Sequence, residues 1–170
     1  MITKVISGGQ TGVDQAALDT AIEFEILTGG WCPRGGRDET GSCFLNRYSF
    51  LRETSSPNPD ERTKLNIESS DGTLILLPKI PIPDHIKDGT LLTIRYAETV
   101  KKPYILISLE GGDQIEKILR WIDENNISVL NIAGPRESSA PGIYNNAREF
   151  FHALYAELKH NHATTLRSKL

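Results

Sequence analysis

Strand-length apolar runs alternate with segments of helical periodicity along most of the chain. The clearest helical segment has apolar residues at the i, i+3, i+4 and i+7 positions of one face: Ile115, Ile118, Leu119 and Ile122. Repeated strand–helix alternation predicts a parallel sheet with right-handed crossovers and helices on both faces, an α/β fold of about five strands. The predicted strands are 2–7, 27–30, 72–77, 104–108 and 129–133, and the predicted helices are 13–24, 60–69, 89–101, 114–125 and 144–159.

Size and charge exclude several classes of protein. With 170 residues the chain suits one domain with a sizeable core. The formal charge of −3 gives no basic footprint for nucleic acid or a membrane surface, and the apolar runs are too short to span a bilayer.

Because no signal pattern precedes the first strand and two cysteines make no disulfide framework, we expect a cytoplasmic protein. We predict a single domain over 1–158 and a flexible tail over 159–170.

A long irregular stretch, residues 31–59, interrupts the alternation and is called the long loop below. Loops of this length in a compact domain are usually functional lids or disordered segments. Cys32 and Cys43 do not have the spacing of zinc ligands, which favours ordinary thiols and no metal site. Several large side chains favour a loop that packs on the domain: Trp31, Phe44, Tyr48, Phe50 and Leu51.

A glycine-rich turn links the first predicted strand to the first predicted helix and reads SGGQTGVD over residues 7–14. Backbone N–H groups in such a turn lie at the positive end of the helix dipole and suit an anion or a polar ligand. The alternative is a tight connection without a ligand, although three glycines with Gln10 and Thr11 exceed what a turn needs. The candidate ligand-binding residues of this turn are Gly8, Gly9, Gln10, Thr11, Gly12 and Asp14.

The turn differs from two common phosphate-binding loops. A P-loop continues with Gly-Lys-Ser/Thr, whereas Val13 and Asp14 follow Gly12 here. A dinucleotide site needs an acid after the second strand, where this chain reads TGGW over 28–31. We therefore expect neither ordinary ATP or GTP hydrolysis nor ordinary NAD binding. Asp14 is either a plain first-turn acid favoured by the dipole or an acceptor for a ligand hydroxyl or amino group.

Further candidates follow other predicted strands, because ligands collect at the carboxyl ends of parallel strands. Gly89 and Thr90 open a helix, either as a cap or as a ligand contact. Gly134 and Arg136 follow the last predicted strand. The guanidinium group of Arg136 can donate two parallel hydrogen bonds to a phosphate group. The alternative is a surface salt bridge between Arg136 and a nearby acid. Trp31 is a candidate for stacking on a ligand ring. Further positive charge comes from Arg34, Arg37 and Arg62.

Several motifs together resemble the family named "putative molybdenum carrier": SGGQTGVD (7–14), GGWCP (29–33), SDGTLI (70–75), NIAGPRES (131–138) and PGIY (141–144). The similarity extends in order to about residue 158. This family belongs to a Rossmann-like group that includes the lysine-decarboxylase-like, cytokinin-activating phosphoribohydrolases, with circularly permuted motifs. The resemblance implies a three-layer Rossmann-like fold, often in a homo-oligomer. The ligand it implies is a small phosphorylated nucleotide-like molecule or the molybdenum cofactor, molybdopterin.

One departure from the related hydrolases bears on catalysis. Their signature, PGGxGTxxE, ends in a glutamate that assists cleavage of an N-glycosidic bond, and Thr93 stands at the comparable position in KDGTLLT (87–93). A threonine hydroxyl is no general acid or base near neutral pH, so this departure argues against the hydrolase mechanism. Thr93 is a ligand-binding candidate. The leading hypothesis is a carrier or binding protein. The alternatives are a nucleoside-phosphate hydrolase or transferase, with Glu53 or Glu98 as the catalytic carboxylate, and a nucleotide-sensing signalling module.

Overall fold

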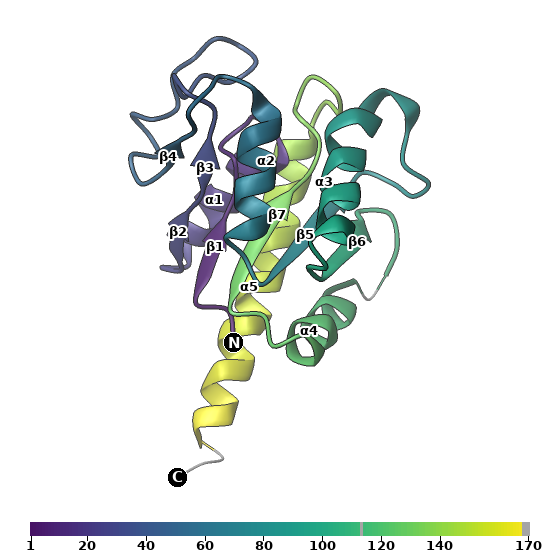
Figure 1. Ribbon diagram of the computed structural model, residues 1–170. Helices are drawn as coiled ribbons and strands as arrows, with labels where there is room; N and C mark the ends of the chain where they lie inside the picture. Colours follow the sequence, from purple (N-terminus) through teal and green to yellow (C-terminus); the bar gives the residue numbers. More distant parts are fainter. Residues whose placement is uncertain (113, 168–170) are drawn as a thin grey trace.

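The computed structural model describes residues 1–112 and 114–167, except for the side chains of residues 87, 88 and 162–167 (Figure 1). Its main sheet has five strands, all parallel, in the order β2-β1-β7-β5-β6. This confirms the predicted α/β class and the parallel sheet. The strands are β1 Lys4–Ile6, β2 Leu27–Gly29, β5 Gly72–Leu77, β6 Tyr104–Ser108 and β7 Val129–Ala133.

The strand order is that of a permuted Rossmann sheet. Counted from β7 as the first strand, followed by β1, β2, β5 and β6, the spatial order becomes 3-2-1-4-5. The strand that begins a Rossmann sheet is therefore the last strand of this chain. The order reverses between β7 and β5, and ligands of such sheets bind in the crevice at this switch point.

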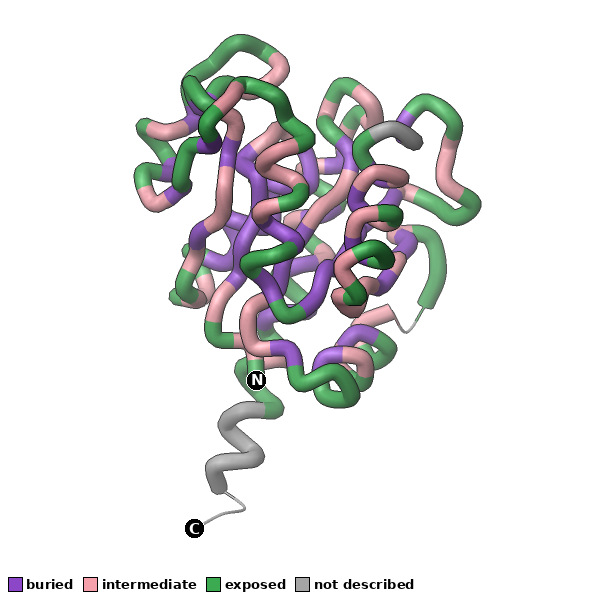
Figure 2. The backbone as a smooth tube through the Cα atoms, viewed as in Figure 1, coloured by how far each residue is buried: buried purple, intermediate pink, exposed green. Residues whose placement is uncertain are grey.

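Helices cover both faces of the sheet, as predicted (Figure 1). On one face, α1, α4 and α5 share a hydrophobic core with alternate side chains of β5, including Leu74 and Leu76. On the other face, Ile75 and Leu77 pack against residues of α3 and of the 3-10 helix η1 (Asp84–Ile86). Figure 2 shows that burial is concentrated along the central strands. The helices are α1 Val13–Glu23, α2 Pro59–Glu68, α3 Lys87–Thr99, α4 Gln114–Glu124 and α5 Ile143–Arg167.

The last helix is longer than predicted. It continues past residue 159 to Arg167, because neither glycine nor proline interrupts the segment. The backbone of the predicted tail is therefore helical up to this residue, and the flexibility of the tail stays a prediction. Within residues 1–112 and 114–167, we find no helix with both the length and the apolar character of a membrane span.

The long loop is ordered by its own core and by two short strands that the sequence did not predict. Strands β3 (Trp31–Cys32) and β4 (Arg52–Glu53) pair in parallel. Phe44, Tyr48 and Leu51 are buried with Cys32 and with Leu18 of α1. This confirms that aromatic side chains hold the loop on the domain. Burial also raises the pKa of the Cys32 thiol to about 11, so this side chain is an inert, neutral core group.

Asp71 stabilises the start of β7. Its carboxylate accepts hydrogen bonds from the backbone N–H groups of Val129 (2.7 Å) and Ser128 (3.0 Å). The bond from Val129 is the main reason that the pKa of Asp71 is lowered, although burial acts in the opposite direction. An acid with a lowered pKa in the folded state stabilises the protein above its unfolded pKa, and the stabilisation is lost as the pH falls through the folded value.

We expect Asp71→Ala to lower the free energy of unfolding at pH 7 by about 1 kcal/mol, because two backbone donors lose a charged acceptor. The difference from the native protein should begin to shrink as the pH falls below about 4, the pKa of an aspartate in the unfolded chain, and should disappear once the folded carboxylate also takes up a proton. Urea denaturation at several pH values measures both effects. Asp123→Ala, which removes an exposed acid of α4, is the control. A deficit that is the same at pH 3 and pH 7 would contradict the assignment.

Candidate functional site

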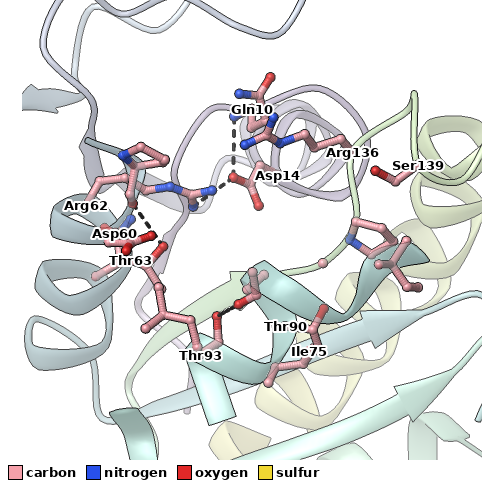
Figure 3. A pocket seen from close by; sticks show the side chains of 18 of the residues that line it. Gln10, Asp14, Asp60, Arg62, Thr63, Ile75, Thr90, Thr93, Arg136 and Ser139 are labelled. Atoms are coloured by element: carbon pink, nitrogen blue, oxygen red, sulfur yellow. Dashed lines mark hydrogen bonds and ion pairs between the residues drawn. The ribbon is translucent and has the colours of Figure 1, made fainter. Parts of the chain in front are cut away.

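A polar pocket of about 520 Å³ lies at the carboxyl ends of β5 and β7, at the switch point of the sheet (Figure 3). Ile75 of β5 and Asn131 and Ala133 of β7 line it from the sheet. The remaining walls come from the glycine turn, the start of α1, one side of α2, the first two turns of α3, η1 and the loop after β7. The pocket is therefore where the topology alone places a ligand.

Three helices begin at this pocket. Asp14 lies in the first turn of α1, Pro59 and Asp60 begin α2, and Gly89 and Thr90 lie in the first turn of α3. The side chain of Asn58 caps α2 by accepting a hydrogen bond from the amide of Asp60 (3.0 Å). Some N–H groups of these helix starts are already paired, such as that of Val13 with the carbonyl of Pro135 (3.2 Å). The positive ends of the three helix dipoles still favour an anionic group in the pocket.

Gly89 has the open surroundings that a ligand contact requires. Apart from its chain neighbours and the backbone of its own helix, no described atom lies within 4 Å of the position that a Cβ would take there. The backbone at the start of α3 is therefore accessible from the pocket. This supports the prediction that Gly89 belongs to the site.

Asp14 is a buried carboxyl group at the centre of the site, with only 2% of its surface exposed. It accepts hydrogen bonds from the amide of Gln10 (3.3 Å) and from Nη1 of Arg62 (3.1 Å) (Figure 3). Burial raises its pKa, while the positive charges of Arg62 and Arg136 act in the opposite direction. A buried carboxyl group with two guanidinium groups nearby is a common feature of functional sites.

Arg62 reaches the pocket because Gly8 has no side chain. A Cβ at Gly8 would lie 2.1 Å from Nη1 of Arg62, so any larger residue would displace the guanidinium group. The ion pair with Asp14 then fixes the arginine in place. Of the additional arginines considered from the sequence, Arg62 lines the pocket, whereas Arg34 and Arg37 do not.

The glycines of the turn mostly allow other parts of the protein to pack closely against its backbone. A Cβ at Gly9 would lie 2.8 Å from the side chain of Leu51. At Gly12 it would lie 2.5 Å from the carbonyl oxygen of Pro135. The amide of Thr11 already donates to the side-chain oxygen of Gln10 (3.0 Å). The turn therefore serves close packing, and only Gln10 and Asp14 of its predicted ligand-binding residues line the pocket.

The structure separates the predicted residues into two groups. Those that line the pocket are Gln10, Asp14, Gly89, Thr90, Thr93, Gly134 and Arg136. Those that do not are Gly8, Gly9, Thr11, Gly12, Trp31, Glu53 and Glu98. The indole of Trp31 donates to Oγ of Ser69 (3.2 Å).

The proposed catalytic glutamates have partners elsewhere. Glu53 accepts a hydrogen bond from the amide of Gly35, and Glu98 accepts one from the hydroxyl of Tyr104 (2.8 Å). The hydroxyl of Thr93 donates to the carbonyl of Gly89 (2.9 Å), so its proton is engaged within α3. Among the described side chains, the carboxyl groups that line the pocket are instead Asp14 and Asp60.

Two buried asparagines of the pocket were not predicted from the sequence. Asn66 holds β3 through two bonds to the backbone of Trp31: its Oδ1 accepts from the amide (2.7 Å) and its Nδ2 donates to the carbonyl (3.0 Å). Nδ2 of Asn131 donates to Oγ1 of Thr73 in the neighbouring strand β5 (3.1 Å). The available signals for Asn131 are an amide within the apolar run VLNIA and its place at the start of the motif NIAGPRES. Within the described side chains, no three His, Cys, Asp or Glu residues are grouped as a metal ligand set.

Comparisons with known proteins agree with this architecture. The model of the family described as "Circularly permutated YpsA SLOG family" matches residues 5–155. A crystal structure of a protein from Syntrophus aciditrophicus SB, named "Putative molybdenum carrier protein", is 40% identical in sequence. That match covers 90% of this chain and 94% of the other, with a TM-score of 0.78. No curated protein sequence matches. The family match and the permuted strand order together show that this chain belongs to the circularly permuted YpsA SLOG family.

Proposed function

We propose that this protein binds a small phosphorylated, nucleotide-like molecule in the pocket between β5 and β7. The observation that carries the proposal is the convergence of Arg62, Arg136 and three helix starts on one polar pocket at the switch point. Guanidinium groups and helix N-termini are the usual partners of a phosphate group.

The size and composition of the pocket limit the ligand. A volume of about 520 Å³ lies within the range of small-molecule sites. Ile75, Ile86 and Leu92 supply apolar surface for a ring. Asp14 and Asp60 line the same pocket as the two arginines and offset part of their positive charge. A monophosphate, with its smaller negative charge, therefore suits the pocket better than a triphosphate.

Molybdopterin is one ligand of this class, and it is supported by the molybdenum-carrier name of the related protein from Syntrophus aciditrophicus. The pocket would hold it as cargo, with the arginines on the phosphate and the polar side chains, including Asn131, near the heterocycle. This proposal requires hydrogen bonds to the ligand and no direct protein ligand to molybdenum.

We expect isothermal titration calorimetry to detect binding of at least one nucleoside monophosphate or of molybdopterin. Arg136→Ala should weaken it by about tenfold or more, because a charge-assisted hydrogen bond contributes about 1.5–3 kcal/mol. Arg136 is exposed, so the variant should fold normally. Arg95→Ala on the exposed side of α3 is the matched control and should bind like the native protein.

Measuring released base in the same mixtures distinguishes binding from hydrolysis. Steady release that disappears in Asp60→Asn would establish the hydrolase alternative, since Asp60 is a pocket carboxylate with access to a ligand. If no compound of this class binds, or if Arg136→Ala and Arg95→Ala behave alike, the proposed function is wrong.

A further inference from the structure

The carboxylate of Glu39, in the long loop, accepts hydrogen bonds from two other parts of the domain. The hydroxyl of Thr11 in the glycine turn donates to Oε1. The amide of Ser138, in the loop after β7, donates to the same oxygen (3.0 Å), and the hydroxyl of Ser138 donates to Oε2. Three donors from two separate segments thus surround one anionic group.

The surroundings keep this carboxylate charged. Burial alone would raise the pKa of Glu39, but the hydrogen bonds from Ser138 and Thr11 outweigh it and lower the pKa. The positive charge of Arg136 acts in the same direction. The amide of Glu137 also donates to Oγ1 of Thr11 (3.3 Å), which orients the hydroxyl towards the carboxylate. The cluster is therefore complementary to an oxyanion.

Its location is that of a phosphate site in related topologies. The loop after β7 follows the first strand of the Rossmann count, where the phosphate groups of nucleotides bind in this fold class. Ser138, Arg136 and Gln10 all line the pocket, so the cluster adjoins it directly. In this structure a carboxylate of the chain itself occupies that position.

The segment that carries Glu39 has few other attachments. Residues 37–43 form a hairpin that is closed by its own bonds, including the amide of Asp38 to the carbonyl of Ser42 (3.0 Å). In the described part of the chain, the hydrogen bonds from this hairpin to the glycine turn and to the loop after β7 all involve Glu39. Gly35 and Gly41 have positive φ angles and open space around them. The carboxylate of Glu39 accepts three of these bonds, and its backbone amide donates the fourth to Gln10 (2.9 Å), so release of the carboxylate would leave the hairpin with only the bond to Gln10.

We propose that Thr11 and Ser138 form an oxyanion subsite that Glu39 occupies in the ligand-free protein and leaves when a tetrahedral oxyanion, such as the phosphate of the ligand, binds. The inference rests on the proposed function for the identity of the bound molecule. The subsite itself is defined by its donors and can be tested with inorganic phosphate alone.

Calorimetric titration with inorganic phosphate tests this competition. Glu39→Ala empties the subsite and Glu39→Gln removes the charge, so both variants should bind phosphate about tenfold or more tightly than the native protein. Adding Ser138→Ala to Glu39→Ala should cancel most of the gain, because the subsite then lacks one donor. Glu124→Gln is the control: it removes one carboxylate charge from an exposed position of α4, outside the pocket, and should leave phosphate affinity unchanged.

Unchanged or weaker phosphate binding in folded Glu39 variants would overturn the proposal, because Glu39 would then only fasten the loop. If neither variant folds, limited trypsin digestion of the native protein decides. Phosphate should accelerate cleavage after exposed Arg37, and no acceleration would overturn the proposal. If the subsite proposal is wrong, nucleotide binding that depends on Arg136 is still expected. If the proposed function is wrong, the Glu39 variants should still bind inorganic phosphate more tightly. The two failures are therefore distinguishable.

Discussion

Replacing Gly12 by alanine is expected to lower the free energy of unfolding by about 3–4 kcal/mol. The backbone at Gly12 has a φ of 78° and a ψ of −127°, a region almost restricted to glycine that costs a residue with a Cβ about 1–3 kcal/mol. The new methyl group would also lie 2.5 Å from the carbonyl oxygen of Pro135 and 2.8 Å from the amide nitrogen of Glu137. These are backbone atoms that cannot rotate away, and overpacking of this kind costs about 1–3 kcal/mol more. Urea denaturation measures the sum.

Gly41→Ala separates the two contributions. Gly41 has a similar φ of 83°, but no described atom other than those of its chain neighbours lies within 4 Å of its Cβ position. This variant should lose only about 1 kcal/mol, the cost of the backbone conformation. Equal losses at both positions would show that packing against the loop after β7 does not matter.

The second large effect is expected at Asp19. Asp19→Ala should lower the free energy of unfolding by about 3–4 kcal/mol, because each buried donor left without a partner costs about 1–3 kcal/mol. The carboxylate of Asp19 is buried in α1 and accepts three hydrogen bonds. The donors are the hydroxyls of Tyr48 (2.8 Å) and Tyr144 (2.6 Å) and the guanidinium group of Arg47 (2.6 Å). Asp19 thereby ties the long loop and α5 to α1. Thermal and urea denaturation give the change.

Tyr48→Phe is the partner experiment for Asp19. It keeps the aromatic ring of the loop core and removes one of the three donors, so it should lose about 1–2 kcal/mol. Burial, followed by the bond to Asp19, raises the pKa of Tyr48, so the hydroxyl keeps its proton and acts as a donor at neutral pH. If Asp19→Ala were no worse than Tyr48→Phe, the carboxylate would not act as the common acceptor.

The elements were predictable from the sequence because their signals are local. The periodicity of apolar residues in α4 and the continuous apolar run of β5 are both readable within a dozen residues. Strands β3 and β4 were not predicted, because two-residue strands leave no periodic pattern. The order of the sheet depends on which distant strands pair, such as Lys4 with Val129, and local periodicity carries no information on this.

The candidate site was predictable only in part, for a similar reason. Gly89, Thr90, Gly134 and Arg136 follow strands, so the rule for parallel sheets places them correctly at the pocket. The glycine turn was recognisable as a special backbone, but its sequence could not show that Phe44, Leu51 and the guanidinium group of Arg62 lie against its glycines. These neighbours come from segments far along the chain.

The position of β7 also determines when the sheet can form during synthesis. This strand pairs with β1 on one side and with β5 on the other, yet it is the last of the five to leave the ribosome. Until then, the β1–β2 pair and the β5–β6 pair have no strand to join them, and each exposes an open edge. Completion of the fold is therefore a late, long-range event, and the nascent chain depends on β7 and the helix that follows it for a continuous core.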